Sequence, residues 1–209
     1  MSGRFVTFEG IEGVGKSTQL AAARQHLQNA GVDVCVTREP GGTVLAEKIR
    51  DLLLDADNEG MVADAELLLM FAARAQHLAE RILPALAAGR WVLCDRFTDA
   101  TYAYQGGGRG IGAQRVATIE QWVQGTLQPD ATILLDASPE VGLARARSRG
   151  GDRDRFEREQ LLFFQRVRDA YLQRAAEQPD RFTVVDATQA VTQVTAEVKQ
   201  ILDGLRGNN

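Results

Sequence analysis

The segment from Gly10 to Ser17 constrains the fold of this chain more than any other. It reads Gly-Ile-Glu-Gly-Val-Gly-Lys-Ser and fits the phosphate-binding pattern G-x-x-x-x-G-K-[ST]. The residues before it, Arg4 to Glu9, are typical of a short buried strand, and Ser17 to Gln28 are typical of a helix. Glycines let backbone N–H groups converge on phosphate oxygens at the positive end of that helix. The sequence therefore predicts a site for a nucleoside triphosphate.

Lysine usage supports this interpretation. The chain has three lysines, Lys16, Lys48 and Lys199, and otherwise uses arginine for its cations. A lysine kept inside the glycine-rich loop indicates that a compact point charge is needed there. We expect Lys16 to reach the outer phosphates and the Ser17 hydroxyl to ligate Mg²⁺. The alternative is a glycine-rich turn that binds nothing, which the fit of both flanks disfavours.

Composition limits the classes of partner. The chain has 209 residues and a formal net charge of −4, which predicts one domain and argues against a general nucleic-acid or membrane-surface binder. No apolar run approaches the length of a membrane span. Met1 leads almost directly into a core strand, so we expect no signal peptide and a cytoplasmic location. Cys35 and Cys94 fall in predicted strands and are interpreted as small buried hydrophobes.

Short apolar runs alternate with helical patterns along the whole chain. This alternation, together with the glycine-rich loop, predicts an α/β protein of the P-loop NTP hydrolase fold, a single domain over residues 1–209. A five-stranded parallel sheet would carry helices on both faces. The predicted strands are Phe5–Phe8, Val32–Val36, Trp91–Cys94, Ala131–Leu135 and Phe182–Val185, and the predicted helices are Ser17–Asn29, Leu45–Leu54, Asp64–Ala88, Gln114–Leu127, Glu140–Arg149, Arg155–Glu177 and Val191–Leu205.

Some segments break these patterns. Asp33 interrupts the second strand, which we therefore place nearer an edge of the sheet. Gly106 to Gly110 is predicted to be a flexible loop. Arg145 to Arg158 is dense in arginine and broken by two glycines, and Gly207 to Asn209 is expected to be frayed.

Ligands bind beyond the carboxyl ends of the strands in such sheets, so the residues at those ends matter most. Asp95 and Arg96 follow the third predicted strand. A hydrophobic strand that ends in Asp beside a P-loop commonly holds Mg²⁺ or its water, so we interpret Asp95 as the acid on the metal side and Arg96 as an anchor for a second phosphate. A surface salt pair is the alternative. Asp136 also ends a strand and is interpreted as a helix cap.

The kind of P-loop protein follows by exclusion. Neither Lys48 nor Lys199 lies in an Asn-Lys-x-Asp motif, which guanine-specific proteins carry, and the chain is too short for a large motor or helicase. A small phosphotransferase remains, with a second site rich in arginine if its substrate is a phosphate ester. The candidates are Arg38, Arg50, Arg74 and Arg96.

At this point the chain resembles the bacterial thymidylate kinases, a family of P-loop nucleoside monophosphate kinases. The resemblance covers nearly the whole chain. The blocks that carry it are F-E-G-I-E-G-V-G-K-S-T (Phe8–Thr18), T-R-E-P-G-G-T (Thr37–Thr43), F-A-A-R (Phe71–Arg74), D-R-F-T-D-A-T-Y-A-Y-Q-G-G-G-R-G (Asp95–Gly110) and D-R-F-E (Asp154–Glu157).

The resemblance implies transfer of the γ-phosphoryl group of MgATP to dTMP, giving dTDP and ADP, a step in dTTP biosynthesis. ATP and Mg²⁺ are the implied cofactors and a homodimer is the implied assembly. Ser17 and Asp95 would serve the metal, and Lys16, Asp95 and Arg96 would act in catalysis. The ATP-binding residues would be Gly10, Ile11, Glu12, Gly13, Val14, Gly15, Lys16, Ser17 and Thr18.

The resemblance also assigns the acceptor site. Arg50 and Arg96 would hold the phosphate of dTMP, and Glu12 would face the sugar 3′-OH. Arg74 would donate to the thymine carbonyl. The implied dTMP-binding set is Glu12, Arg38, Glu39, Pro40, Arg50, Met70, Phe71, Arg74, Arg96, Thr101 and Gln105.

Two positions depart from the family pattern. The family usually stacks thymine on a Phe four residues before the helical arginine, where this chain has Met70, with Phe71 one step later. Both share a helical face with Arg74, so either can cover the ring or pack in the core. Thr101 replaces a common Ser and keeps the hydroxyl.

The P-loop lacks the arginine that one group of the family carries there. The chain resembles the other group, whose catalytic arginine comes from a mobile lid, here about residues 148–156. Arg149 and Arg153 are the candidates, and a solvated loop of mixed charge is the alternative. Two rival functions stay open from the sequence: a kinase of another monophosphate or of a deoxynucleoside, and a nucleotide-binding switch without transfer activity.

Overall fold

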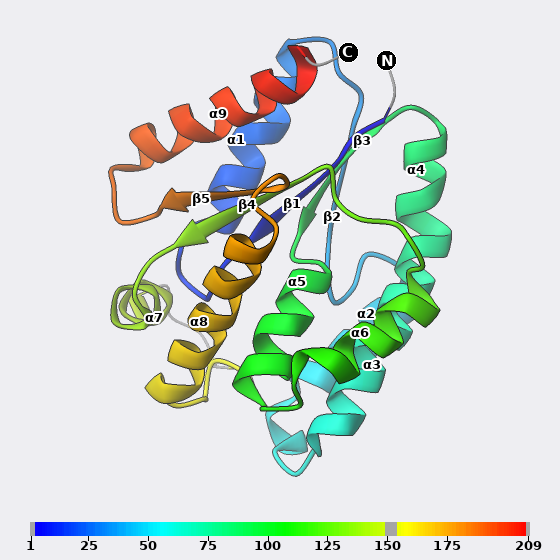
Figure 1. Ribbon diagram of the computed structural model, residues 1–209, viewed down its shortest axis with the longest axis vertical. Helices are drawn as coiled ribbons and strands as arrows, with labels where there is room; N and C mark the ends of the chain where they lie inside the picture. The colour runs from blue at the N-terminus through cyan, green and yellow to red at the C-terminus, as the bar shows by residue number, and fades with distance from the viewer. Residues whose placement is uncertain (1–2, 149–153, 208–209) are drawn as a thin grey trace.

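The computed structural model describes residues 3–148 and 154–207, which form a three-layer α/β arrangement around one parallel sheet (Figure 1). The strand order is β2-β3-β1-β4-β5. The strands are β1 (Phe5–Glu9), β2 (Val34–Arg38), β3 (Trp91–Asp95), β4 (Ala131–Asp136) and β5 (Phe182–Asp186). The predicted five-stranded parallel sheet with helices on both faces is confirmed, and β2 lies at an edge, as predicted from the interruption of its apolar run by Asp33.

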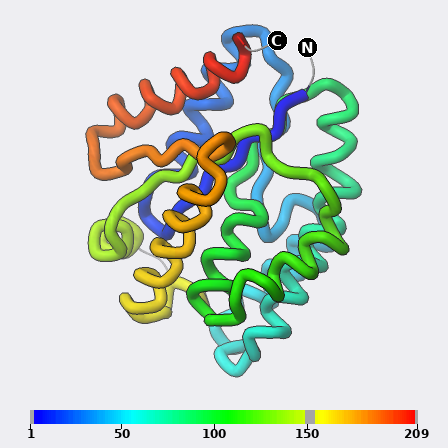
Figure 2. Tube along the Cα trace, in the orientation of Figure 1, coloured from blue at the N-terminus to red at the C-terminus, as the bar shows by residue number. Residues whose placement is uncertain are grey.

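Helices cover both faces of the sheet. The helices are α1 (Lys16–Asn29), α2 (Val44–Leu54), α3 (Ala63–His77), α4 (Leu83–Ala87), α5 (Thr98–Thr101), α6 (Ala113–Val123), α7 (Pro139–Ser148), α8 (Leu161–Glu177) and α9 (Val191–Gly207). Helices α1 and α9 pack together on one face, where Figure 2 shows the red end of the chain alongside the blue start. Helices α4, α5 and α8 lie on the other face.

The central strands are buried on both faces, which explains their nearly continuous apolar sequence. Val6, Phe8, Leu93 and Ile133 have no exposed surface. Thr7 on β1 is also fully buried, and its hydroxyl pairs with the Thr132 hydroxyl of β4 at 2.9 Å. Cys35 and Cys94 are free and buried, as predicted. Among the described residues, no helix is long and apolar enough to cross a membrane.

The long helix predicted over residues 64–88 is interrupted. It consists of α3, a π-helical turn (Leu78–Ile82) and α4. Pro84 follows the turn by two residues, and it has no N–H to donate to the preceding turn. The π-helical turn widens the helix locally, which accommodates both the lost hydrogen bond and the bulk of the proline ring.

The flexible loop predicted at Gly106–Gly110 is wrong for most of its length, because Tyr102–Gly108 forms a largely buried π-helical segment against α8. These glycines serve close packing. A Cβ on Gly107 would lie 2.7 Å from the Cβ of Ala170 and 3.1 Å from the carbonyl oxygen of Arg166. Glycine is required here because it has no side chain, and the flexibility of its backbone plays no part.

The start of α8 and the role of Asp136 also differ from the predictions. Helix α8 begins at Leu161 and not at Arg155, because residues 155–158 form turns that the Asp154 carboxylate caps by accepting from the N–H groups of Phe156 and Glu157, both at 2.9 Å. Asp136 is not a helix cap. Its two oxygens accept from Arg168 at 2.8 and 2.7 Å, so it joins the end of β4 to α8.

The close approach at Gly107 gives a test of the packing. We expect Gly107→Ala to lower the free energy of unfolding by about 1–3 kcal/mol, since neither Ala170 Cβ nor a backbone carbonyl can rotate away. Gly204→Ala is the matched control, because Gly204 lies at an exposed position of α9, where an added Cβ would have no described atom within 4 Å. That control should gain about 0.5–1 kcal/mol. Urea unfolding measures both, and equal stability of Gly107→Ala and the wild type would contradict the packing.

Candidate active site

The glycine-rich loop joins the buried end of β1 to the first turn of α1. Gly13 has a φ of 77°. A Cβ there would lie 1.8 Å from the carbonyl oxygen of Gly142 on α7, so the loop fits only without a side chain. The Lys16 ammonium folds back over the loop and donates to the carbonyls of Gly10 at 3.0 Å and Ile11 at 2.8 Å. Burial, followed by the charge of Arg96, lowers the pKa of Lys16 to about 8.

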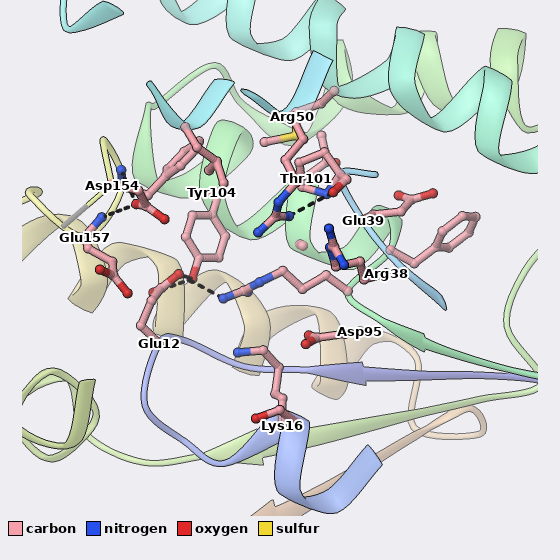
Figure 3. A pocket seen from close by; sticks show the side chains of 18 of the residues that line it. Glu12, Lys16, Arg38, Glu39, Arg50, Asp95, Thr101, Tyr104, Asp154 and Glu157 are labelled. Carbon is pink, nitrogen blue, oxygen red and sulfur yellow. Dashed lines mark hydrogen bonds and ion pairs between the residues drawn. The ribbon is translucent and has the colours of Figure 1, made fainter. Parts of the chain in front are cut away.

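The end of β3 presents Asp95 toward the same space as Lys16 (Figure 3). Oδ1 of Asp95 is buried and has no hydrogen-bonding partner among the described residues. The exposed Ser17 lines the same pocket. A carboxylate and a hydroxyl are hard oxygen donors, and Mg²⁺ uses one or two such protein groups together with substrate phosphates. Asp95 and Ser17 therefore fit the predicted metal.

Arg96 has a φ of 67°, and it is the single non-glycine residue with a positive φ in the described part of the chain. Its Nη1 donates to the Gly10 carbonyl at 2.8 Å and its Nη2 to Glu12 at 2.9 Å. The guanidinium also lies over the Tyr104 ring, with 4.8 Å between its Cζ and the ring centroid. Backbone strain of this kind is typical of functional positions, where the surroundings hold the conformation.

The buried carboxyl group of Glu9 helps to hold this conformation. It accepts from the Phe97 N–H and from the Tyr171 hydroxyl, both at 2.7 Å. The Tyr171 hydroxyl in turn accepts from Arg96 at 3.2 Å. Burial, and then the charge of Asp99, raises the pKa of Glu9 to about 8. Glu9 belongs to the strand ends at which the sequence predicts ligand binding, but sequence reasoning gave it no specific role.

Several arginine side chains line the part of the pocket around Arg96. Arg38 and Arg50 line it beside Arg96, with Arg50 donating to the Pro40 carbonyl at 2.8 Å. Burial, and then the neighbouring charge of Arg38, lowers the pKa of Arg50. Arg38 also pairs with Glu47 at 2.7 Å on the exposed side. A cluster of guanidinium groups at this density suits a multiply charged phosphate.

Arg74 is buried and belongs to the same pocket. Its Nε donates to Glu39 at 2.7 Å and its Nη2 to the Thr101 hydroxyl at 2.9 Å. The guanidinium lies between two aromatic rings, with centroids 4.7 Å away for Phe71 and 5.1 Å for Phe97. Nη1 is buried without a partner among the described residues, and Arg74 lines the pocket. Nη1 can therefore donate a hydrogen bond to an acceptor on a ligand, such as a carbonyl oxygen.

Glu12 and Gln105 are also held in place by hydrogen bonds. Both carboxylate oxygens of Glu12 accept from the Tyr104 hydroxyl, at 2.8 and 2.7 Å, as Figure 3 shows. The Gln105 amide donates to the buried carboxylate of Glu66 at 2.6 Å, and Arg155 donates to the same carboxylate at 2.6 Å. Sequence reasoning did not single out Tyr104, Glu66 or Arg155 for any role.

The structure brings most of the predicted residues into one pocket. Met70 lines it, whereas Phe71 is 2 % exposed and packs in a cluster with Leu67 and Tyr102. The predicted residues that line the pocket are Glu12, Gly13, Gly15, Lys16, Ser17, Arg38, Glu39, Pro40, Arg50, Met70, Arg74, Asp95, Arg96, Thr101 and Gln105. The predicted residues that do not line it are Gly10, Ile11, Val14, Thr18 and Phe71.

The segment predicted to be a lid, residues 148–156, is described only at its two ends, Ser148 and residues 154–156. Arg149 and Arg153 lie outside the described residues, so their catalytic role stays a prediction. After the gap, Asp154, Phe156 and Glu157 line the pocket.

Comparison with known proteins decides the family. A family model described as thymidylate kinase matches residues 8–198. The chain belongs to the thymidylate kinase family. It is 58 % identical to the thymidylate kinase of Pseudomonas putida (strain F1) and 58 % identical to that of Ectopseudomonas mendocina (strain ymp), each over 98 % of this chain and 97 % of the relative.

A solved structure agrees with these relatives. The crystal structure of the thymidylate kinase from Ehrlichia chaffeensis is similar over 97 % of this chain and 99 % of that chain, with a TM-score of 0.78 and 34 % sequence identity. The predicted membership of the thymidylate kinase family is therefore confirmed, and with it the kinase class.

The raised pKa of Glu9 predicts how stability depends on pH. The folded protein holds this proton up to about pH 8, whereas in an unfolded chain the carboxyl titrates near its ordinary value of 4.5. Stability from the neutral carboxyl is thus complete below pH 4.5 and is lost as the pH rises to about 8.

Glu9→Gln keeps one acceptor and one donor and cannot ionise, so it should remove this loss. We expect wild-type stability to fall relative to the variant by at most about 1.4 kcal/mol per pH unit. Urea unfolding at pH 5.5, 6.5 and 7.5 measures the difference. Parallel profiles for the two proteins would show that Glu9 is ionised throughout.

Proposed function

We propose that the chain transfers the γ-phosphoryl group of MgATP to dTMP, giving dTDP and ADP. One observation carries the proposal. A P-loop, an Asp95 oxygen, an arginine cluster and an Arg74 donor line one pocket, and neither that oxygen nor that donor has a partner among the residues that the structure describes. The first two suit a metal-bound triphosphate, and the last two suit a phosphate ester with a carbonyl-bearing base.

The donor half is formed by the loop and the two strand ends. The N–H groups of the loop and the first turn of α1 would bind the phosphates of ATP. The Lys16 ammonium, now on two loop carbonyls, would exchange them for phosphate oxygens, which favour its charged form. Ser17 and Asp95 would hold Mg²⁺, which neutralises charge on the phosphates.

The acceptor half follows from the arginine positions. Arg96 and Arg50 would hold the acceptor phosphate beside the loop, and Arg38 lies on the same side. Glu12, fixed by Tyr104 and Arg96, would meet the sugar hydroxyl. Arg74 Nη1 would donate to a thymine carbonyl, Thr101 and Gln105 would complete base recognition, and Met70 would cover the ring.

No general base is required, because the acceptor phosphate is already anionic. The rate would come from holding two charged substrates in line and from neutralising charge on the transferred group. Arg96 is placed for both tasks, since its guanidinium already bonds the Gly10 carbonyl of the donor loop.

A panel of monophosphates tests the proposal. With MgATP and equal concentrations of dTMP, dUMP, dCMP and dGMP, we expect dTDP to form fastest, measured by chromatography of the products. A clear preference for another acceptor would replace dTMP with that substrate. Binding of ATP without any diphosphate product would identify a nucleotide-binding switch.

Two variants make the assay specific to the site. Lys16→Ala and Arg96→Ala should each lower turnover by roughly 100-fold or more, the usual effect of losing one charged donor to the reacting group. Lys199→Ala on α9 is the matched control and should keep wild-type turnover. Near-normal turnover of both site variants would contradict the site.

We also propose a homodimer formed through α3. Its outward face carries Leu68, Ala72 and Ala75, and Ala79 continues the same side in the π-helical turn that follows; all four are exposed. The neighbouring helices α2 and α6 pack against α3, and α6 carries Trp122, which is 83 % exposed. Exposed apolar stripes of this kind are typical of protein interfaces.

Ala72→Glu should convert the dimer to a monomer, because two buried charges would face each other or apolar surface across the symmetry axis. Light scattering coupled to size exclusion measures the mass. Leu162→Glu on α8 is the control, since Leu162 is 69 % exposed on a different helix. A wild-type protein with the mass of a monomer would contradict the proposal.

A further inference from the structure

A buried chain of hydrogen bonds runs from the end of β2 to Arg74. Glu39 Oε2 accepts from Arg74 Nε at 2.7 Å, and its Oε1 accepts from His77 Nδ1 at 2.9 Å. The other ring nitrogen of His77 pairs with the Thr37 hydroxyl at 2.6 Å. Arg74, Glu39, His77 and Thr37 are all buried, and His77 has no exposed surface.

The geometry fixes the direction of each group. A carboxylate only accepts, so Nδ1 of His77 carries the proton that binds Glu39. Among the described residues, each Glu39 oxygen has one hydrogen-bonding partner, Arg74 on one side and His77 on the other. Without His77 the carboxylate would lose one of the two bonds that set its rotation. Arg74 would then lose the fixed acceptor that orients its Nε edge.

The turn after β2 closes directly over this chain. A Cβ on Gly42 would lie 2.5 Å from His77 Nε2 and 2.7 Å from Thr37 Oγ1. The backbone thus shields the His77–Thr37 pair on that side. The pair is part of a packed unit that includes Glu39, which lines the pocket, although His77 and Thr37 do not line it.

The orientation of Arg74 decides where Nη1 points, the nitrogen that has no partner in the described part of the chain. Nε binds Glu39 and Nη2 binds Thr101, so the guanidinium plane is set by two bonds, and Nη1 is left as the free donor. A pyrimidine with a carbonyl at C4 offers that donor an acceptor. A pyrimidine with an amino group at C4 offers it another donor, which leaves both groups unpaired.

We propose that His77 is a positioning residue for base selection: by holding Glu39, it fixes the Arg74 donor that prefers a C4 carbonyl to a C4 amino group. This inference rests on the proposed function, because it takes a pyrimidine monophosphate as the acceptor. His77 acts through Glu39 and Arg74 and does not touch the substrate.

The experiment compares His77→Leu, His77→Gln and Thr37→Val in the full chain with MgATP, using dTMP and dCMP as acceptors. His77→Leu should raise KM for dTMP about tenfold, the effect of leaving one buried acceptor unpaired, with kcat and the KM for ATP within about twofold. The ratio of kcat/KM for dTMP over dCMP should fall by a similar factor. His77→Gln keeps an amide donor and should restore most of that ratio.

Thr37→Val removes only the far bond and should shift the same ratio in the same direction by a smaller factor. The other histidine of the chain provides the matched control. His26 bonds Asp203 at 2.8 Å between α1 and α9, so His26→Gln should leave both acceptors unchanged.

The outcomes separate the two proposals. If wild type does not phosphorylate dTMP, the proposed function fails. If wild type is active and the soluble His77 and Thr37 variants lose dTMP and dCMP activity in equal proportion, or lose neither, the role of His77 in base selection is overturned. If His77→Leu does not fold, the ratio in His77→Gln and Thr37→Val decides in the same way.

Discussion

The register between β1 and β3 is the constraint on which the candidate site depends. Phe8 pairs with Asp95, so the loops that leave the two strands start side by side. The Arg96 N–H then donates to the Phe8 carbonyl at 3.0 Å, and the Phe97 N–H donates to Glu9 at 2.7 Å. A one-residue slip would turn the buried side chains of β1 to the opposite face, so the packing of the core fixes this register. Core packing thereby sets the distance between the proposed donor loop and the proposed acceptor anchor.

The sheet was predictable from the sequence because its signals are local. Each buried strand is a short apolar run, and the glycine-rich loop identifies which strand ends at a ligand. The loop at Gly106–Gly110 was not predictable, because a glycine signals either freedom of the backbone or close approach by a neighbour. The neighbour of Gly107 is Ala170, more than sixty residues later in the chain. The prediction that Asp136 caps a helix was wrong for the same reason. Its partner Arg168 lies on a helix that packs against it only in the folded protein.

The residues of the candidate site show the same contrast between local and long-range signals. Residues within motifs, such as Lys16 or Arg96, can be proposed from the sequence because their neighbours in sequence carry the signal. Residues that reach the pocket through distant contacts give no such signal. Tyr171 reaches Glu9 across 162 positions, and His77 reaches Glu39 across 38. A lone tyrosine or histidine on a helix is usually a core residue, and only the folded contacts distinguish these two from that ordinary case.

Charge balance explains why the pocket tolerates so many arginines. Three guanidinium groups that line or border it each have a carboxylate beside them: Glu12 for Arg96, Glu39 for Arg74 and Glu66 for Arg155. Glu66 also accepts a hydrogen bond from Gln105. It therefore links Gln105, which is proposed to recognise the base, to Arg155. Two parts of the pocket that are far apart in the sequence thus share one buried carboxylate. If the base of the acceptor nucleotide moved Gln105, the hydrogen bonding of Glu66 would change. Glu66 also binds Arg155, whose neighbours Asp154 and Phe156 line the pocket.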